Sequence, residues 1–201
     1  MDRGPAAFDA THNWRFNAIY RIPNLVASGG AAGRLLNGWW FSGILSLQTG
    51  LPFTPRLSAN RSRSGVNAGR EGDRPDLAPG RSFDGIVSSR DVHRYFDPTA
   101  FAVPEAGFLG NAGRNILRGP GLANLDFSIA KDTPLRYLGE AGKLEFRAEF
   151  FNILNRPNFS SPDRIVFAGN ASGEAPLPTA GRIVSTATTS RQLQFALKIV
   201  F

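Results

Sequence analysis

The chain has 201 residues, of which 42% are hydrophobic, with 22 glycines, 14 prolines and 16 phenylalanines. This length fits one domain, and this composition is typical of strands and turns rather than of helices. The absence of cysteine excludes disulfides, thiolate catalysis and cysteine-ligated zinc. The net charge of +7 would suit nucleic acid or an anionic lipid surface, but no aromatic RNA-binding motif accompanies the arginines. We therefore expect no nucleic-acid partner.

Two stretches are the candidates for a targeting or membrane-spanning segment. Residues 1–11 lack the apolar core of a signal peptide. Residues 38–55 carry no charge, but they contain several polar side chains and break at residues 50–52. That break comes too early for the roughly 20 apolar residues of a transmembrane helix. We therefore expect neither a signal peptide nor a transmembrane helix in this sequence.

Residues 13–22 and 38–49 both alternate between apolar and polar positions. A period of two predicts strands with different surroundings on their two faces. Each stretch is about as long as the roughly 9–11 residues with which a tilted strand crosses a bilayer. Residues 23–37 are rich in Gly, Ala and Ser and are predicted to form a turn.

Residues 51–122 show no clean periodicity and contain many arginines, glycines and prolines. They are predicted to be a long loop, in which short hairpins around residues 83–87 or 101–108 are compatible with the pattern. A structureless loop of this length argues against a compact soluble domain. One interpretation of the arginines is contact with an anionic solute or with lipopolysaccharide phosphate. The other, which we favour, pairs them with nearby carboxylates: Asp73, Asp76, Asp84, Asp91 and Asp97.

Three further strands are predicted at residues 124–131, 143–154 and 191–201, again from strict alternation. A helix is the alternative for residues 143–154, but at helical spacing its apolar side chains would surround the whole helix. A short turn at residues 133–142 and a second long loop at residues 155–190 connect these strands.

Glu145 and Glu149 are the best candidates for a pair of catalytic acids. On one strand they lie roughly 13 Å apart, which is too far for such a pair. We expect them to contact Arg147 and an arginine of a neighbouring strand such as Arg15. His12 and His93 have no metal-ligand spacing, and no other catalytic motif is present. We therefore predict no enzymatic activity, no catalytic or metal site and no cofactor.

The connections between the predicted strands alternate between short and long, as the inner turns and outer loops of an outer-membrane barrel do. The predicted fold is therefore all-β: an antiparallel meander of about five long transmembrane-type strands with long outer loops at residues 51–122 and 155–190. Five strands do not close a barrel, so we expect an incomplete portion of a larger outer-membrane β-barrel.

The alternation assigns side chains to two faces of this sheet. The predicted lipid-facing residues are Trp14, Phe16, Tyr20, Trp39, Phe41, Leu45, Phe127, Phe146, Phe150, Leu193, Phe195, Leu197 and Ile199. The predicted polar residues facing the lumen are Asn13, Arg15, Asn17, Asp126, Ser128, Glu145, Arg147, Glu149, Gln192, Gln194 and Lys198.

Several segments, in one order along most of the chain, resemble the C-terminal end of TonB-dependent outer-membrane receptors. The resemblance is to Oar-like receptors, which carry a carboxypeptidase-regulatory-like N-terminal domain. The matching segments are residues 8–23 (FDATHNWRFNAIYRIP), 38–54, 95–101 (YFDPTAF), 108–131, 144–159 (LEFRAEFFNILNRPNF) and 181–201.

This resemblance implies a place in the cell outer membrane, as part of a full-length receptor for solute uptake. It implies contact with outer-membrane lipid, with the rest of the receptor barrel and the plug, and indirectly with TonB. Phe201 matches the terminal aromatic residue that the barrel-assembly machinery reads. Receptors of this family have a barrel of about 22 strands with a plug inside it. For this chain we predict about five long strands and no plug. We therefore expect residues 1–201 to be a single partial barrel domain, without plug or signal peptide and inactive in transport alone.

The alternative is a secreted or surface-bound β-sandwich that binds glycans or other cells. Its strands would be shorter, and one face of each sheet would pack on a second sheet. A sandwich should dissolve in buffer, whereas a portion of a barrel should need detergent. The sequence does not define the transported solute.

Overall fold

The structure is a computed structural model in which residues 3–27, 30–65, 72–87 and 91–201 are described. The contacts divide the chain into two compact units. Unit 1 comprises Met1–Thr11, Thr49–Gly121 and Phe159–Ala187. Unit 2 comprises His12–Gln48, Leu122–Asn158 and Thr188–Phe201.

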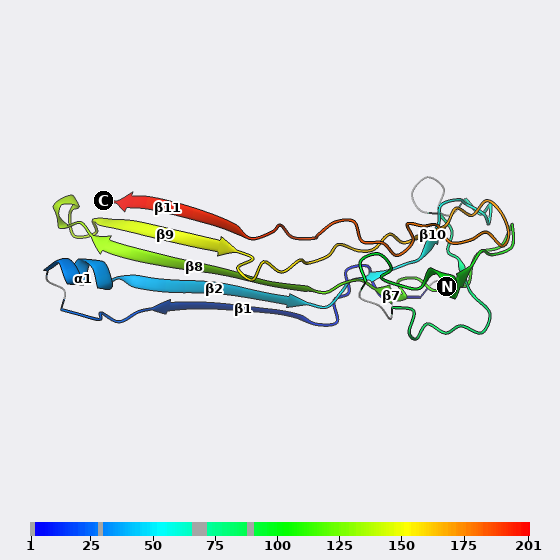
Figure 1. The fold of residues 1–201 in the computed structure, drawn as a ribbon, viewed down its shortest axis with the longest axis horizontal. Coiled ribbons are helices and arrows are strands. Elements are labelled where there is room, and N and C mark those ends of the chain that lie inside the picture. The colour runs from blue at the N-terminus through cyan, green and yellow to red at the C-terminus, as the bar shows by residue number, and fades with distance from the viewer. Residues whose placement is uncertain (1–2, 28–29, 66–71, 88–90) are drawn as a thin grey trace. The chain divides into compact units, whose positions relative to one another are not determined.

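Unit 2 is a five-stranded antiparallel sheet in the order β1-β2-β8-β9-β11 (Figure 1). Its strands are β1 (Asn13–Arg21), β2 (Trp39–Gln48), β8 (Leu122–Pro134), β9 (Lys143–Phe151) and β11 (Gln192–Val200). Strands that follow one another along the chain therefore lie side by side, which confirms the predicted antiparallel meander. β1 and β11 are its outermost strands, and each pairs with one neighbour among the described residues. The sheet does not close into a barrel.

Strand ends differ from the prediction at two places. β8 runs to Pro134, so it continues into the residues predicted to form a turn. β9 is a strand rather than a helix, but it ends at Phe151 rather than at residue 154. The reason is Asn152, which has a φ of 49° and whose side-chain amide donates to the Arg156 carbonyl at 3.0 Å. This contact turns the chain away from the ladder directly after β9.

The region predicted as a turn at residues 23–37 contains a short helix, α1 (Gly30–Leu36). Gly38 follows it with a φ of 83°, a conformation that glycine adopts at little cost at the end of a helix. A side chain at Gly38 would collide with the Asp132 carbonyl. No helix in the described part of the chain is long and apolar enough to span a membrane.

Successive connections of the meander leave from opposite ends of the sheet. Residues 22–38 and 135–142 connect strands at one end, which we call the short-connection end. It carries α1 and the 3-10 turn η2 (Arg136–Leu138). The two long connections, residues 49–121 and 152–191, leave from the other end. The predicted alternation of short and long connections is therefore present in the sheet.

The two long connections contain short elements of regular structure in unit 1. The described residues of this unit form η1 (Pro98–Ala100) and six short strands. The strand pairs are β3 (Pro52–Phe53) with β7 (Leu117–Arg118), β5 (Asp76–Leu77) with β6 (Phe101–Ala102), and β4 (Arg56–Leu57) with β10 (Ile165–Phe167). Within the described residues neither suggested hairpin forms: residues 83–87 are turns and bends, and Phe101 pairs with Leu77 instead of with residue 108.

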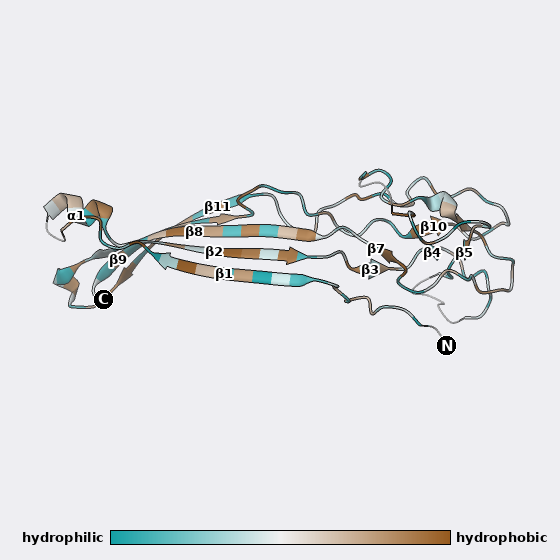
Figure 2. Cartoon of the chain, turned by 90° about the horizontal axis from the view of Figure 1, so that it is seen from below, coloured by the Kyte–Doolittle hydropathy of each residue, from teal (hydrophilic) through white to brown (hydrophobic). Residues whose placement is uncertain are grey.

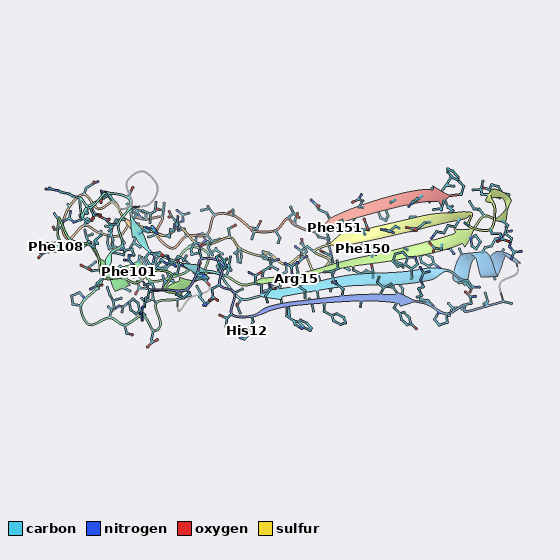
Figure 3. All side chains as sticks on the ribbon, turned by 180° about the vertical axis from the view of Figure 1, so that it is seen from behind. His12, Arg15, Phe101, Phe108, Phe150 and Phe151 are labelled. Atoms are coloured by element: carbon cyan, nitrogen blue, oxygen red, sulfur yellow. The ribbon has the colours of Figure 1, made fainter. Side chains whose placement is uncertain are left out.

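A hydrophobic core explains why these segments fold. Leu57 comes from the first long connection and Phe167 from the second, and both are only 1% exposed. Phe96 is equally buried, with its ring 5.8 Å from that of Phe53 and 6.3 Å from that of Phe101. Figure 3 shows Phe101 within unit 1, whereas Phe108 lies at its margin. The two connections therefore share one core.

The acidic residues of unit 1 do two different things. Asp97 forms ion pairs with Arg81 and Arg94, as predicted for the arginines of this region. Asp73, by contrast, accepts a hydrogen bond from the Ser62 backbone N–H at 2.6 Å. Asp76 and Asp91 likewise accept from the backbone N–H groups of Asn111 and His93. Carboxylates therefore stabilise both arginines and turns in this unit.

The pH dependence of unit 1 is expected to reflect Asp97. Burial raises the pKa of its carboxyl group, but hydrogen bonds from the Thr99 hydroxyl and the Arg94 guanidinium lower it from 3.8 to about 2. Because the pKa is lower in the folded state, this group stabilises unit 1 above about pH 4, and the stabilisation is lost as the pH falls towards about 2. Asp97→Asn should remove this part of the pH dependence of the melting temperature. Asp84→Asn is the control, and an equal loss in both variants would contradict the assignment.

Candidate functional site

The register of the ladder places all the predicted lipid-facing residues on one face of unit 2. Residues paired across neighbouring strands lie on the same face of a sheet. One such row runs through Phe41 and Ile129, and another joins Phe127, Phe150 and Leu193. We call this side the apolar face. Among its members are Trp14, Phe16, Ala18, Tyr20, Trp39, Phe41, Gly43, Leu45, Leu47, Leu125, Phe127, Ile129, Leu144, Phe146, Ala148, Phe150, Leu193, Phe195, Leu197 and Ile199.

Aromatic rings tie neighbouring strands together on the apolar face. The ring of Phe127 lies 5.7 Å from that of Phe41 and 6.4 Å from that of Phe150. The rings of Phe146 and Phe195 are also 6.4 Å apart. Aromatic pairs at these distances stabilise a sheet beyond the area that they bury. The alternation of hydropathy along the strands is visible in Figure 2.

The apolar face is nevertheless uncovered. Leu193, Phe195 and Leu197 are 54%, 66% and 68% exposed. In the residues of unit 2 that the structure describes, no second sheet packs on this face. The described residues of unit 2 therefore do not form the pair of packed sheets that the alternative, a β-sandwich, requires. An apolar surface of this extent indicates an apolar partner or solvent.

The opposite face carries the predicted polar residues. We call it the polar face: Asn13, Arg15, Asn17, Asp126, Ser128, Glu145, Arg147, Glu149, Gln192, Gln194 and Lys198 lie on it by register. The hydroxyls of Ser42 and Ser128 are 2.7 Å apart across β2 and β8. The Asn124 amide donates to Asp126 at 2.8 Å. Polar side chains on this face therefore bind one another across and along the strands.

A charge ladder runs along β9 on the polar face, starting from the short-connection end. It consists of Asp132, Lys143, Glu145, Arg147 and Glu149. The Lys143 ammonium lies 3.1 Å from Asp132 and 3.5 Å from Glu145. The Arg147 guanidinium lies 2.6 Å from Glu145 and 3.5 Å from Glu149. Opposite charges alternate throughout, so each acid of β9 has a cation beside it.

Of the two predicted partners of Glu145 and Glu149, one is confirmed. Arg147 binds both Glu145 and Glu149, as expected. The predicted contact with Arg15 is wrong, because β2 and β8 lie between its strand, β1, and β9. Two guanidinium groups lie over the ring of Trp40, that of Arg147 at 5.5 Å and that of Arg21 at 5.7 Å from the ring centre. Alternation places Trp40 in the polar phase of β2, but it did not indicate that this ring would contact two cations.

Removing one acid from the ladder should destabilise the sheet. In Glu145→Gln, Lys143 and Arg147 lose the carboxylate between them. We expect a loss of about 1–2 kcal/mol in the free energy of unfolding, reduced from the value for a fully buried pair because Arg147 is 37% exposed. Urea unfolding of the chain in detergent micelles measures it. Glu140→Gln, at an exposed turn position, is the control. Equal effects of the two substitutions would contradict a stabilising ladder.

Lys131 is a cation on the apolar face, and sequence reasoning missed it. It pairs with Trp39, and its ammonium lies 5.4 Å from the centre of that ring. The same ammonium donates to the Asn37 carbonyl at 2.7 Å. The ring and the carbonyl therefore hold this charge at the short-connection end. The signal was available, since Lys131 follows Leu125, Phe127 and Ile129 in the same phase of β8.

In the described ranges, no three His, Asp or Glu side chains are grouped so that they would hold a metal ion. What the arrangement does is physical: it presents an apolar surface on one side and ion pairs on the other. A long antiparallel sheet with one apolar and one polar face is typical of the wall of a membrane-spanning β-barrel, and this defines the class of protein. The chain belongs to the outer membrane beta barrel domain family, which matches residues 1–194. Because it belongs to this family, it is an outer-membrane protein. No curated protein and no solved structure matches the chain.

Proposed function

We propose that this chain is the C-terminal part of the barrel of a TonB-dependent receptor of the Oar-like type, and that it takes part in solute uptake. The observation that carries the proposal is the register, which separates an uncovered apolar face from a charged face over five strands. The resemblance of several segments, in one order along most of the chain, supports the narrower assignment to TonB-dependent receptors.

Each face has a role in this proposal. The apolar face, from Trp14 on β1 to Ile199 on β11, meets the hydrocarbon of the outer membrane. The polar face, with the charge ladder, lines the lumen. Phe201, which is 90% exposed, is the residue that the barrel-assembly machinery reads. The long connections lie on the outer side, where they help to capture the solute.

The chain alone is expected not to transport. Among the described residues, β1 and β11 each have no strand paired along one side, and each unsatisfied backbone group costs several kcal/mol in hydrocarbon. The remaining strands of the receptor barrel satisfy these groups, and the plug couples the barrel to TonB. The proposal assigns no catalytic step and no cofactor to this chain.

A graft tests the proposal. Residues 12–201 replace the last five strands of a TonB-dependent receptor whose solute is known, and we call the product the grafted receptor. We expect it to reach the outer membrane and to take up its solute only in cells that contain TonB. A graft without Phe201 should fail to insert into the outer membrane.

Two results would contradict the proposal. One is a chain that does not assemble in the outer membrane as part of the grafted receptor. The other is uptake that continues unchanged after TonB is removed.

A further inference from the structure

Helix α1 presents apolar side chains outwards at the short-connection end. Because successive residues of a helix are about 100° apart, Ala31, Ala32, Leu35 and Leu36 form one stripe. Gly33, on another side of the helix, is its buried residue. Leu35 and Leu36 are 67% and 41% exposed. The helix therefore turns its apolar stripe away from the protein, the reverse of what packing against the protein would give.

Two hydrogen bonds hold the end of α1 beside the apolar face. The Trp39 indole N–H donates to the Leu35 carbonyl at 3.0 Å. The Lys131 ammonium donates to the carbonyl of Asn37, directly after the helix, at 2.7 Å. Both Trp39 and Lys131 lie on the apolar face by register. The apolar stripe of the helix is therefore next to the surface that meets lipid in the proposed function.

We propose that α1 lies in the phospholipid headgroup layer at the short-connection end, with Leu35 and Leu36 reaching towards the acyl chains. This inference rests on the proposed function, because it requires the apolar face to meet hydrocarbon. The occupant of the helix surface is the lipid itself. A short amphipathic helix with a basic residue beside its apolar stripe is the kind of element that binds at a membrane interface.

The charges near the helix fit the phosphates of such a layer. Arg34 is exposed and lines an open hollow of about 470 Å³ beside Gly30 and Leu35. Lys131 and the exposed Arg136 of η2 lie at the same end of the sheet. Tryptophan and lysine at the end of an apolar surface are typical of the boundary between hydrocarbon and headgroups, where the ring and the charge each meet a suitable solvent. The boundary is therefore placed at the Trp39–Lys131 row.

The absence of cysteine makes a labelling experiment direct. The full chain is prepared with a single cysteine at Leu35, Phe195 or Val184, each carrying an environment-sensitive fluorophore. All three side chains are more than half exposed, so labelling should leave the fold intact. The labelled chain is built into the grafted receptor, with a host that has no cysteine, so that β1 and β11 are paired. It is placed in bicelles of phosphatidylcholine and phosphatidylglycerol that contain a lipid quencher either near the headgroup or deep in the acyl chain.

The label at Leu35 should lose more fluorescence to the shallow quencher than to the deep one. The label at Phe195, in the middle of β11, should show the reverse order. The label at Val184, an exposed apolar residue of unit 1, should be quenched by neither lipid but by aqueous iodide. Adding Arg34→Glu should reduce the shallow quenching at Leu35 and leave Phe195 unchanged, because it places a carboxylate against the phosphates.

The outcomes separate this inference from the proposed function. Quenching of Phe195 by iodide alone would overturn both. Lipid quenching of Phe195 together with iodide quenching of Leu35 would place the helix in water and overturn this inference alone. Protection of Leu35 from both lipid and iodide would show that protein, such as a second copy of the chain, covers the helix, and would also overturn it.

Discussion

Phe195→Arg is expected to destabilise the folded barrel in the membrane, lowering its free energy of unfolding by about 2–4 kcal/mol. This is the cost of a cation on the lipid face near the middle of a bilayer. Phe195 lies near the centre of β11 and stacks on Phe146. The substitution also removes this ring contact. Urea titration of the grafted receptor in phospholipid vesicles measures the effect, since folded and unfolded barrels migrate differently in gels.

The neighbouring residue supplies the matched control. Gln194 points to the polar face and pairs with Glu149 across the ladder. In Gln194→Arg the new cation meets a carboxylate, so we expect a change of less than about 0.5 kcal/mol. Equal costs at the two positions would contradict the assignment of the faces to lipid and lumen.

Phe96→Ala is expected to destabilise unit 1 by about 3–5 kcal/mol, the usual cost of removing a buried phenylalanine ring. Phe96 is 1% exposed and its ring contacts those of Phe53 and Phe101. A domain is commonly stable by only about 5–15 kcal/mol, so this loss should open the unit measurably. Amide hydrogen exchange of the full chain in detergent micelles follows the opening.

Exchange should report on both long connections together. The Leu57 N–H donates to the Asp73 carbonyl in the first connection, and the Leu177 N–H donates to the Val166 carbonyl in the second. Phe96→Ala should accelerate both amides. Phe83→Ala is the control, because Phe83 is 46% exposed. Acceleration confined to one connection would contradict a shared core.

The long strands were predictable because one local rule determines them. A period of two over many residues, as in residues 191–201, gives both the strand and the division of its side chains between two faces. Antiparallel neighbours joined in chain order then follow from the connections. The ends were less predictable, because a side-chain contact such as that of Asn152 decides where the ladder stops.

Unit 1 was not predictable from periodicity. Its strands have two or three residues, too few to show a period. Its core joins Leu57 to Phe167 through the parallel pairing of β4 and β10, two segments that are distant in the sequence. Nothing local in either segment indicates the other. The signal that the sequence does contain is the presence of aromatic residues such as Phe53, Phe96 and Phe101, which are unusual in a flexible loop.

The charged residues were predictable by face but not by partner. Alternation placed Arg15 and Glu149 on the polar face, and this holds by register. The predicted meander already places two strands between Arg15 and Glu149, so the suggested contact did not agree with the predicted strand order. Helix α1 was missed because seven residues flanked by glycine resemble a turn.

The pairing of β4 with β10 also restricts how such a protein can change during evolution. Leu57 and Val166 belong to different connections but fill one core, so a substitution in one is acceptable only if the other accommodates it. Recombination that exchanged a single connection between relatives would leave mismatched halves. Diversification of this region therefore has to proceed by exchanging both connections together, or by altering side chains that the core does not use.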